Sequence, residues 1–213
     1  MTQNKIFYRR NLPHWQPRNR PIFSTFRLAG SLPAEAISLL KARANLDQLQ
    51  SNAQNATSTL NQPDSMKQTW FRITETWLDD PKTGPTWLKN PQVAKLVGEV
   101  LHHLDARDYH LDCFTIMPNH VHMVFTLLPG GPDMAAIMHR IKGFTASKAN
   151  SLLGRKGPFW QGESFDHVVR SQSALLKTVR YILENPVKAG LVTRWQDWPF
   201  SYVNDALKAA IKL

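Results

Sequence analysis

The stretch MPNHVHMVFTL, residues 117–127, limits what this chain can fold into more than any other part of it. Every second residue from Val121 to Leu127 is apolar, and this alternation predicts a β-strand with one face against a core. Because residues i and i+2 of a strand point to the same side, His120 and His122 should share the opposite face. The stretch therefore predicts a strand that carries two imidazoles side by side.

Residues 109–117 also alternate, and the turn residues Pro118 and Asn119 connect them to the histidine strand. The two strands are expected to form an antiparallel hairpin, with the histidines at the start of its second strand. The residues expected on one face of the first strand are Tyr109, Leu111, Cys113, Thr115 and Met117. Cys113 is the sole cysteine, so a disulfide framework is excluded and a buried thiol is expected.

Helices and two more strands are expected around this hairpin. The strands cover residues 22–28 and 165–170, and helices begin near residue 33, at 91, near 134 and around 171. The last helix is expected to end at Asn185, because Pro186 stops it. The helix near 134 should bury the stripe Met134, Ile137, Met138, Ile141 and Phe144. With right-handed crossovers, this order predicts an α+β fold: a ferredoxin-like antiparallel sheet with helices on one face and a C-terminal helix free to cross the other.

All of residues 1–213 are expected to form a single domain with two less regular parts. Residues 1–20 are expected to form an extended basic arm, either along phosphates or simply solvated; its charges are Arg9, Arg10, Arg18 and Arg20. Residues 47–68 have hardly any large apolar side chain and predict a flexible or loosely helical insertion. This insertion lies within a long first crossover, residues 31–105.

The charge balance favours a polyanionic partner. Lys and Arg number 26 against 16 Asp and Glu, a net charge of +10 that recurs along the chain. This balance favours nucleic acid over a solvated basic face or an anionic membrane surface. There is no apolar leader at the N-terminus and no run of 18 apolar residues, so we expect a soluble protein in a reducing compartment.

The two histidines suit a divalent metal but do not complete a site. The spacing alone is weak evidence, since 8 histidines in 213 residues give about 0.3 such pairs by chance. The alternation of the strand strengthens this evidence, because it places both histidines on the face opposite the apolar residues. A third ligand and a reactive group are still required.

The last helix offers both. Its apolar residues Leu175, Leu176, Val179, Ile182 and Leu183 cluster in one sector. Tyr181 and Asn185 share a different face, together with Lys177. Beside a metal, the Asn185 amide oxygen could be a ligand and the Tyr181 phenol a nucleophile. The alternative is an exposed tyrosine on a helix surface without a catalytic role.

Taken together, these motifs resemble a known family. MPNHVH, then FWQGESFDHVVR, then YILENPVKAGL and WPF occur in the order typical of the REP-associated tyrosine transposases, which are IS200/IS605-like, single-tyrosine HUH enzymes. The resemblance implies a metal-dependent DNA endonuclease and strand transferase. It implies that His120, His122 and Asn185 are the metal ligands and Tyr181 the catalytic nucleophile.

The resemblance also implies the substrate and the chemistry. Mg²⁺ or Mn²⁺ would polarise a phosphate of single-stranded DNA near a hairpin such as a repetitive extragenic palindrome, and Tyr181 would form a 5′-phosphotyrosine with release of a 3′-OH. Residues expected to bind DNA phosphates are Arg9, Arg10, Lys142, Lys148, Arg155, Lys156, Arg170, Lys177 and Lys188. The expected location is cytoplasmic and nucleoid-associated, with no membrane partner.

Several alternatives stay open from the sequence. The chain could be a non-catalytic nucleic-acid-binding protein on the same fold, or a metal-dependent hydrolase in which water attacks the phosphodiester. The sequence does not decide between a monomer and a homodimer. Two departures from the family, the long crossover 31–105 and Ser201-Tyr202 after WPF, are not expected to touch the four site residues.

Overall fold

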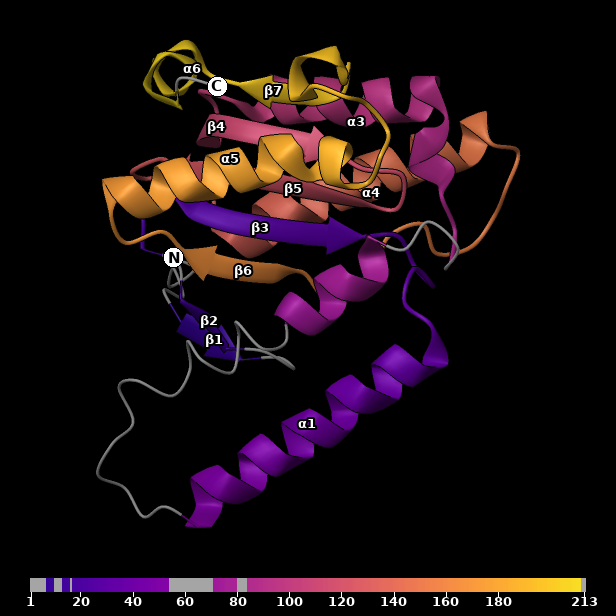
Figure 1. The fold of residues 1–213 in the computed structure, drawn as a ribbon, viewed down its shortest axis with the longest axis vertical. Coiled ribbons are helices and arrows are strands. Elements are labelled where there is room, and N and C mark those ends of the chain that lie inside the picture. The colour runs from indigo at the N-terminus through magenta and orange to yellow at the C-terminus, as the bar shows by residue number, and fades with distance from the viewer. Residues whose placement is uncertain (1–6, 10–12, 16, 54–70, 80–83, 212–213) are drawn as a thin grey trace.

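A five-stranded antiparallel sheet forms the centre of the protein (Figure 1). The computed structural model describes residues 7–9, 13–15, 17–53, 71–79 and 84–211. The strand order is β6-β3-β5-β4-β7. The strands are β3 (Ile22–Arg27), β4 (Tyr109–Ile116), β5 (His120–Leu127), β6 (Phe165–Val168) and β7 (Ser201–Val203). The expected α+β fold with an antiparallel sheet is confirmed, with the three-residue edge strand β7 added to the four strands that the sequence predicts.

Helices cover both faces of this sheet (Figure 1). On one face lie α3 (Pro91–Leu104) and α4 (Met134–Leu152), and on the other lie α5 (Gln172–Lys188) and α6 (Asp205–Ile211). The C-terminal tyrosine helix therefore crosses the second face, as expected. Among the described residues, no helix is long and apolar enough to cross a membrane.

The remaining elements are peripheral. Two 3₁₀ turns and a separate two-stranded hairpin occur, namely η1 (Trp87–Lys89), η2 (Trp195–Asp197), β1 (Phe7–Arg9) and β2 (Pro13–Trp15). The expectation that residues 1–20 form an extended arm is therefore wrong for β1 and β2, which pair with each other. Helix α1 (Ala34–Ala53) projects from the body and includes the start of the polar stretch 47–68, whose part from 54 onward lies outside the described residues.

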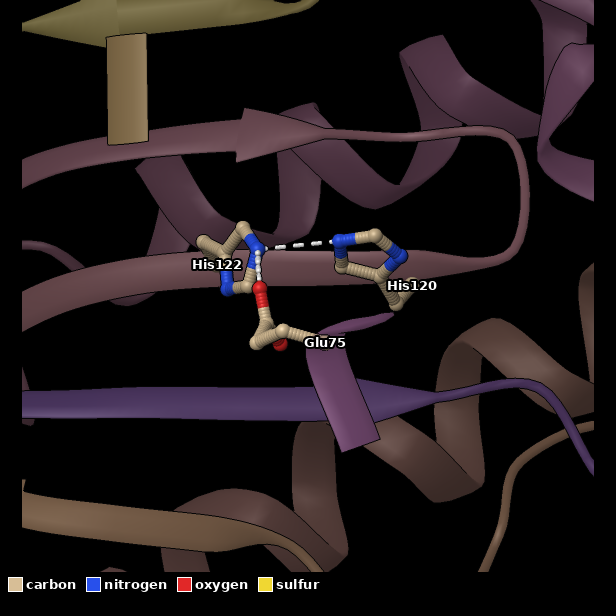
Figure 2. Close-up of side chains that lie close together, drawn as sticks. All are labelled: Glu75, His120 and His122. Carbon is tan, nitrogen blue, oxygen red and sulfur yellow. Dashed lines mark hydrogen bonds and ion pairs between the residues drawn. The ribbon is translucent and has the colours of Figure 1, made fainter. Parts of the chain in front are cut away.

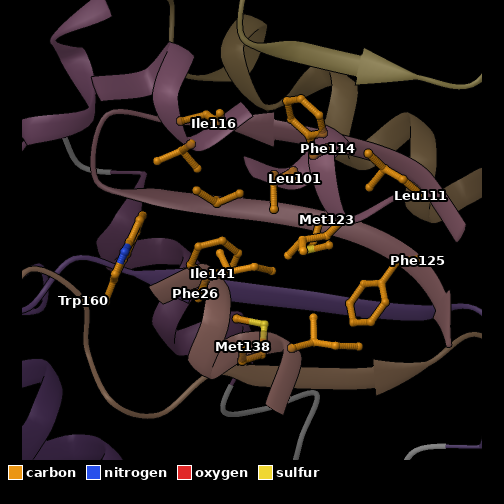
Figure 3. Close-up of a cluster of buried hydrophobic side chains, with 14 of the residues drawn as sticks. Phe26, Leu101, Leu111, Phe114, Ile116, Met123, Phe125, Met138, Ile141 and Trp160 are labelled. Carbon is orange, nitrogen blue, oxygen red and sulfur yellow. The ribbon is translucent and has the colours of Figure 1, made fainter. Parts of the chain in front are cut away.

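The hairpin of β4 and β5 divides its side chains between the two faces. Val121, Met123 and Phe125 are fully buried in the core beneath α3 and α4, as the alternation predicts (Figure 3). His120 and His122 point to the other face, and both are also fully buried. The prediction that the apolar residues and the histidines point to opposite faces of β5 is thus confirmed, but the face that carries the histidines is covered by protein.

The expected common face of the first hairpin strand is wrong. Tyr109 and Leu111 belong to the core beneath α3 and α4, whereas Cys113 packs in the cluster beneath α5. The register shifts between Leu111 and Cys113, because a β-bulge inserts one residue there and reverses the facing of those that follow. Beyond the bulge, Phe114 and Ile116 face α3 and α4.

Two details of the helices also differ from the sequence prediction. Helix α5 continues through Pro186 to Lys188. A proline this close to the end of a helix removes only one backbone hydrogen bond near the last turn, and the ring of Pro186 is buried. Phe144 of α4 is 52% exposed, with Lys148 Nζ lying 5.9 Å from the centre of its ring, so it does not belong to the buried stripe, which continues from Ile141 through Thr145 and Ala149.

Asp112 gives the fold a testable pH dependence. Burial raises the pKa of this β4 carboxyl from 3.8 to about 6, although its Oδ1 accepts a hydrogen bond from Asn204 Nδ2 at 3.2 Å. The stabilisation from protonated Asp112 is complete below the unfolded pKa of about 4 and is lost as the pH rises through about 6. The Asp112→Asn variant should therefore gain in melting temperature relative to the wild type across this range, and the difference should stay constant above it. A difference independent of pH would contradict this assignment.

Candidate active site

His120 is held in one tautomer by the turn that precedes it. Its Nδ1 lies 2.7 Å from Asn119 Oδ1, and Asn119 Nδ2 donates to the Leu78 carbonyl oxygen at 3.0 Å. Because the Asn119 oxygen can only accept, His120 Nδ1 is the donor and its Nε2 carries the lone pair. Burial, together with the charge of His122, lowers the pKa of His120 to about 3, so the ring is neutral near pH 7. A neutral ring with Nε2 available is the form that binds metals.

His122 is oriented from the neighbouring strand. Its Nδ1 lies 2.7 Å from Thr25 Oγ1 of β3, and its Nε2 lies 2.9 Å from His120 Nε2 (Figure 2). Two nitrogen lone pairs at this distance would repel unless a proton or a metal ion lies between them. The strand spacing therefore aims both Nε2 atoms at one point.

The third group at this point is Glu75, which the sequence analysis did not identify. It lies on the helix of residues 71–78, beside the two histidines (Figure 2). Glu75 is only 7% exposed. Its Oε2 is 3.2 Å from His122 Nε2, and ligand atoms of Glu75, His120 and His122 all lie within 4.8 Å of one another. Burial tends to raise the pKa of Glu75, but the charge and hydrogen bond of His122 outweigh this and the net shift is downward. These three residues could hold a divalent metal.

Tyr181 lies beside this group. Its hydroxyl donates a hydrogen bond to Glu75 Oε2, and its ring centre is 5.7 Å from that of His122. Burial and the Glu75 charge raise the pKa of Tyr181 well above its usual range, so the phenol is protonated near pH 7. The predicted proximity of Tyr181 to the histidine strand is thus observed.

Asn185, one turn further along α5, is 1% exposed. Its Nδ2 donates to the Tyr181 carbonyl oxygen at 2.9 Å, while its Oδ1 is buried without a hydrogen-bond partner among the described residues. The prediction that Asn185 is a metal ligand stays a prediction. A buried, unpaired amide oxygen on the turn next to Tyr181 is consistent with that role.

The long first crossover contacts the site, contrary to expectation. Phe71 packs against Tyr181 with ring centres 5.9 Å apart, Glu75 binds both Tyr181 and His122, and the Leu78 carbonyl accepts from Asn119. Tertiary packing brings the helix of residues 71–78 over the histidine face, which is why this face is buried.

The predicted phosphate-binding residues do not all lie near Tyr181. Lys188 Nζ is 4.7 Å from the Tyr181 ring centre, and Lys177 lines a cavity of about 250 Å³ beside the same ring. Lys142 Nζ instead bonds the Gln161 carbonyl at 2.8 Å, and the Arg155 guanidinium stacks 3.5 Å above the centre of the Trp87 ring.

The contacts of Lys142 and Arg155 hold loops of the protein together. Among the described members of the predicted phosphate-binding set, the exposed ones are Lys148, Lys156, Arg170, Lys177 and Lys188. The Arg9 side chain and Arg10 lie outside the described residues.

Comparison with known proteins supports the resemblance. Residues 82–185 match the family described as "Transposase IS200 like". The REP-associated tyrosine transposase of Escherichia coli (strain K12) is 32% identical over 95 residues, which cover 45% of this chain and 54% of that protein. A putative REP-associated tyrosine transposase of Haemophilus influenzae is 30% identical over 105 residues, covering 45% of this chain and 60% of that protein. The chain thus spans little more than half the length of these curated relatives.

The fold also has a counterpart among solved structures. One described as "Structure of the REP associates tyrosine transposase bound to a REP hairpin" aligns with a TM-score of 0.52 over 94% of this chain and 82% of that chain. The sequence identity is 19%, so this likeness concerns the fold. The resemblance stated from the motifs is confirmed over residues 82–185.

Proposed function

We propose, on the premise that residues 82–185 carry the IS200-like transposase sequence, that this protein cleaves and rejoins single-stranded DNA through a phosphotyrosine. The observation that carries the proposal is the convergence of Tyr181, His120 and His122 on the Glu75 carboxylate. The proposal takes residues 1–213 as one catalytic domain. Because its substrate would be cellular DNA, it also implies a cytoplasmic, nucleoid-associated protein.

The side chains fit a divalent metal. His120 Nε2 and His122 Nε2 converge at 2.9 Å, and Glu75 Oε1 and Asn185 Oδ1 are both buried without hydrogen-bond partners among the described residues. Buried oxygens without partners are costly unless another ligand satisfies them. We assign His120, His122 and Asn185 as ligands, with Glu75 as a further donor. Mixed imidazole and oxygen donors suit Mg²⁺ or Mn²⁺, which when bound would polarise the scissile phosphate.

Tyr181 performs the bond exchange. Its oxygen forms a bond to phosphorus while the bond from phosphorus to the 3′ oxygen breaks, and the phenolic proton is balanced by the proton gained by the released 3′-OH. The product is a 5′-phosphotyrosine. Because this phosphodiester replaces the broken one, another 3′-OH can reverse the step and join a different strand without an external energy source.

The substrate class follows from charge and from the relatives. Lys177 and Lys188 flank Tyr181 and could contact phosphates beside the scissile one. A structural relative is described as bound to a REP hairpin, and we propose single-stranded DNA near the foot of such a hairpin as the substrate here. The other basic residues, Arg9, Arg10, Lys142, Lys148, Arg155, Lys156 and Arg170, are proposed as secondary phosphate contacts, with Lys142 and Arg155 weakest because they already hold loops.

A covalent adduct is the direct test of this activity. The purified protein should be incubated with a 5′- or 3′-labelled hairpin oligonucleotide carrying single-stranded flanks, with Mg²⁺ or Mn²⁺, and analysed on a denaturing gel. We expect label from the strand downstream of the cut to migrate with the protein. Cleavage without an adduct would indicate a hydrolase that uses water, and binding without cleavage would indicate a non-catalytic nucleic-acid-binding protein.

Thr25 provides a milder test of the metal site. Thr25→Val keeps the volume of the side chain but removes the hydrogen bond to His122 Nδ1. Partners that orient a ligand histidine typically affect metal affinity by about 10- to 100-fold, and we expect a loss in this range. Calorimetric titration with Mn²⁺ would measure this loss of affinity. The control is Thr126→Val, a substitution on β5, the strand that carries His122. Equal affinity of the wild type and Thr25→Val would contradict the assigned orientation.

A further inference from the structure

We infer that Glu75 is an additional active-site residue, whose single carboxylate is shared between the metal site and the Tyr181 hydroxyl and so positions the nucleophile. This inference rests on the proposed function and deepens it. It makes the helix of residues 71–78, in the long first crossover, a functional part of the site. Glu75 precedes residues 82–185, the part of the chain that matches the transposase family.

The contact with Tyr181 defines the first half of this role. The Tyr181 hydroxyl donates to Glu75 Oε2, and Glu75 is 7% exposed, so the bond is shielded from water. A hydrogen bond from a phenol to a buried carboxylate is charge-assisted and stronger than one between neutral groups. It restricts rotation of the phenol and fixes where its oxygen lies.

The contact with His122 defines the second half. Glu75 Oε2 is 3.2 Å from His122 Nε2, the nitrogen that also faces His120. The other oxygen, Oε1, is buried and has no hydrogen-bond partner among the described residues. A carboxylate has enough lone pairs to bind a metal and still accept from a hydroxyl. Glu75 therefore links the nucleophile to the metal ligands through one rigid group.

Packing on both sides of Glu75 keeps its carboxylate in place. One turn before it, Phe71 packs against Phe23 and Phe165 with ring centres 5.3 and 4.7 Å apart. One turn after it, the Leu78 carbonyl accepts from Asn119, the residue that also sets the tautomer of His120. The helix is thus fixed to the sheet at both ends of the turn that carries Glu75.

The charge of Glu75 does not act alone. Asp79 lies one turn further along, and burial followed by the Glu75 charge raises its pKa, while His122 and Lys188 lower it. The charges of Glu75, His122 and Lys188 therefore all act on the Asp79 carboxyl.

The test compares Glu75→Gln with Glu99→Gln in the full-length protein. Glutamine keeps the shape of Glu75 but loses its charge, whereas Glu99 is an exposed glutamate on α3 whose side chain is 62% exposed. Three readouts are needed: Mn²⁺ affinity by calorimetry, the NMR signal of Tyr181 in protein with ¹³C-labelled tyrosine, and the single-turnover rate of adduct formation at saturating Mn²⁺. Tyr181→Phe assigns the Tyr181 signal.

We expect Glu75→Gln to lower Mn²⁺ affinity by about 10- to 100-fold, shift the Tyr181 signal and slow adduct formation even at saturating metal. Glu99→Gln should change none of these. Unchanged metal affinity would overturn the inference, and so would faster adduct formation, which would mean that the carboxylate obstructs the phosphate. If the wild type forms no adduct, the proposed function fails, and the affinity and NMR comparisons still decide whether Glu75 belongs to the metal site.

Discussion

Replacing Tyr181 with phenylalanine is expected to abolish the protein–DNA adduct and to reduce strand cleavage by at least about three orders of magnitude. The substitution removes one oxygen atom, the one that we propose forms the bond to phosphorus. The ring should keep its contacts with Phe23, Phe71 and His122, whose ring centres lie 6.3, 5.9 and 5.7 Å away. Rates of adduct formation and of cleavage on a labelled hairpin oligonucleotide would measure the effect.

Folding and binding must be separated from chemistry in this experiment. Loss of the hydroxyl leaves Glu75 with one partner fewer, and we expect a decrease in the free energy of unfolding of about 1–3 kcal/mol. Binding of the hairpin should change little. Tyr202→Phe is the matched control, since Tyr202 lies on β7 and packs against Phe114 and His102. Cleavage by Tyr181→Phe at the wild-type rate would show that water or another residue attacks the phosphate.

Replacing His120 with asparagine is expected to reduce Mn²⁺ affinity by at least about 100-fold and to remove adduct formation at ordinary metal concentrations. His120 is fully buried and offers Nε2 because its Nδ1 donates to Asn119. Asparagine preserves polarity but is too short to bring a donor atom to the same point. Calorimetry with Mn²⁺ and the gel assay for the adduct would measure the two effects.

Chelation provides the complementary test of the metal. EDTA should stop adduct formation by the wild type, and added Mg²⁺ or Mn²⁺ should restore it. His139→Asn, a substitution of an exposed histidine on α4, should behave as the wild type in both experiments. Full activity of His120→Asn, or of the chelated wild type, would contradict a metal site at the two histidines.

The histidine strand could be predicted because local pattern and tertiary structure agree there. The alternation from Val121 to Leu127 determines which residues enter the core, and the histidines necessarily point to the other face. Local periodicity also predicts on which face of its helix Tyr181 lies, since this helix has a distinct apolar sector. The pattern failed in β4, because nothing in the alternation between Leu111 and Cys113 indicates a bulge.

Glu75 could not be found in the same way. It lies 45 residues before His120, within a long crossover, and a single glutamate on a short helix has no distinctive pattern. Its position depends on the packing of Phe71 and Leu78 against the sheet, which is a tertiary property. The only feature of the sequence that distinguishes this segment is the length of the crossover, residues 31–105.

The attachment site of the DNA tests the central claim most directly. Protein cross-linked to the cleaved strand can be digested with a protease and a nuclease, and the nucleotide-bearing peptide identified by mass spectrometry. The chain has four tyrosines, Tyr8, Tyr109, Tyr181 and Tyr202. We predict a 5′-phosphate on Tyr181, within the α5 peptide that also contains Asn185. A nucleotide on any other residue, or cleaved DNA without a modified peptide, would contradict the assignment of Tyr181 as the nucleophile.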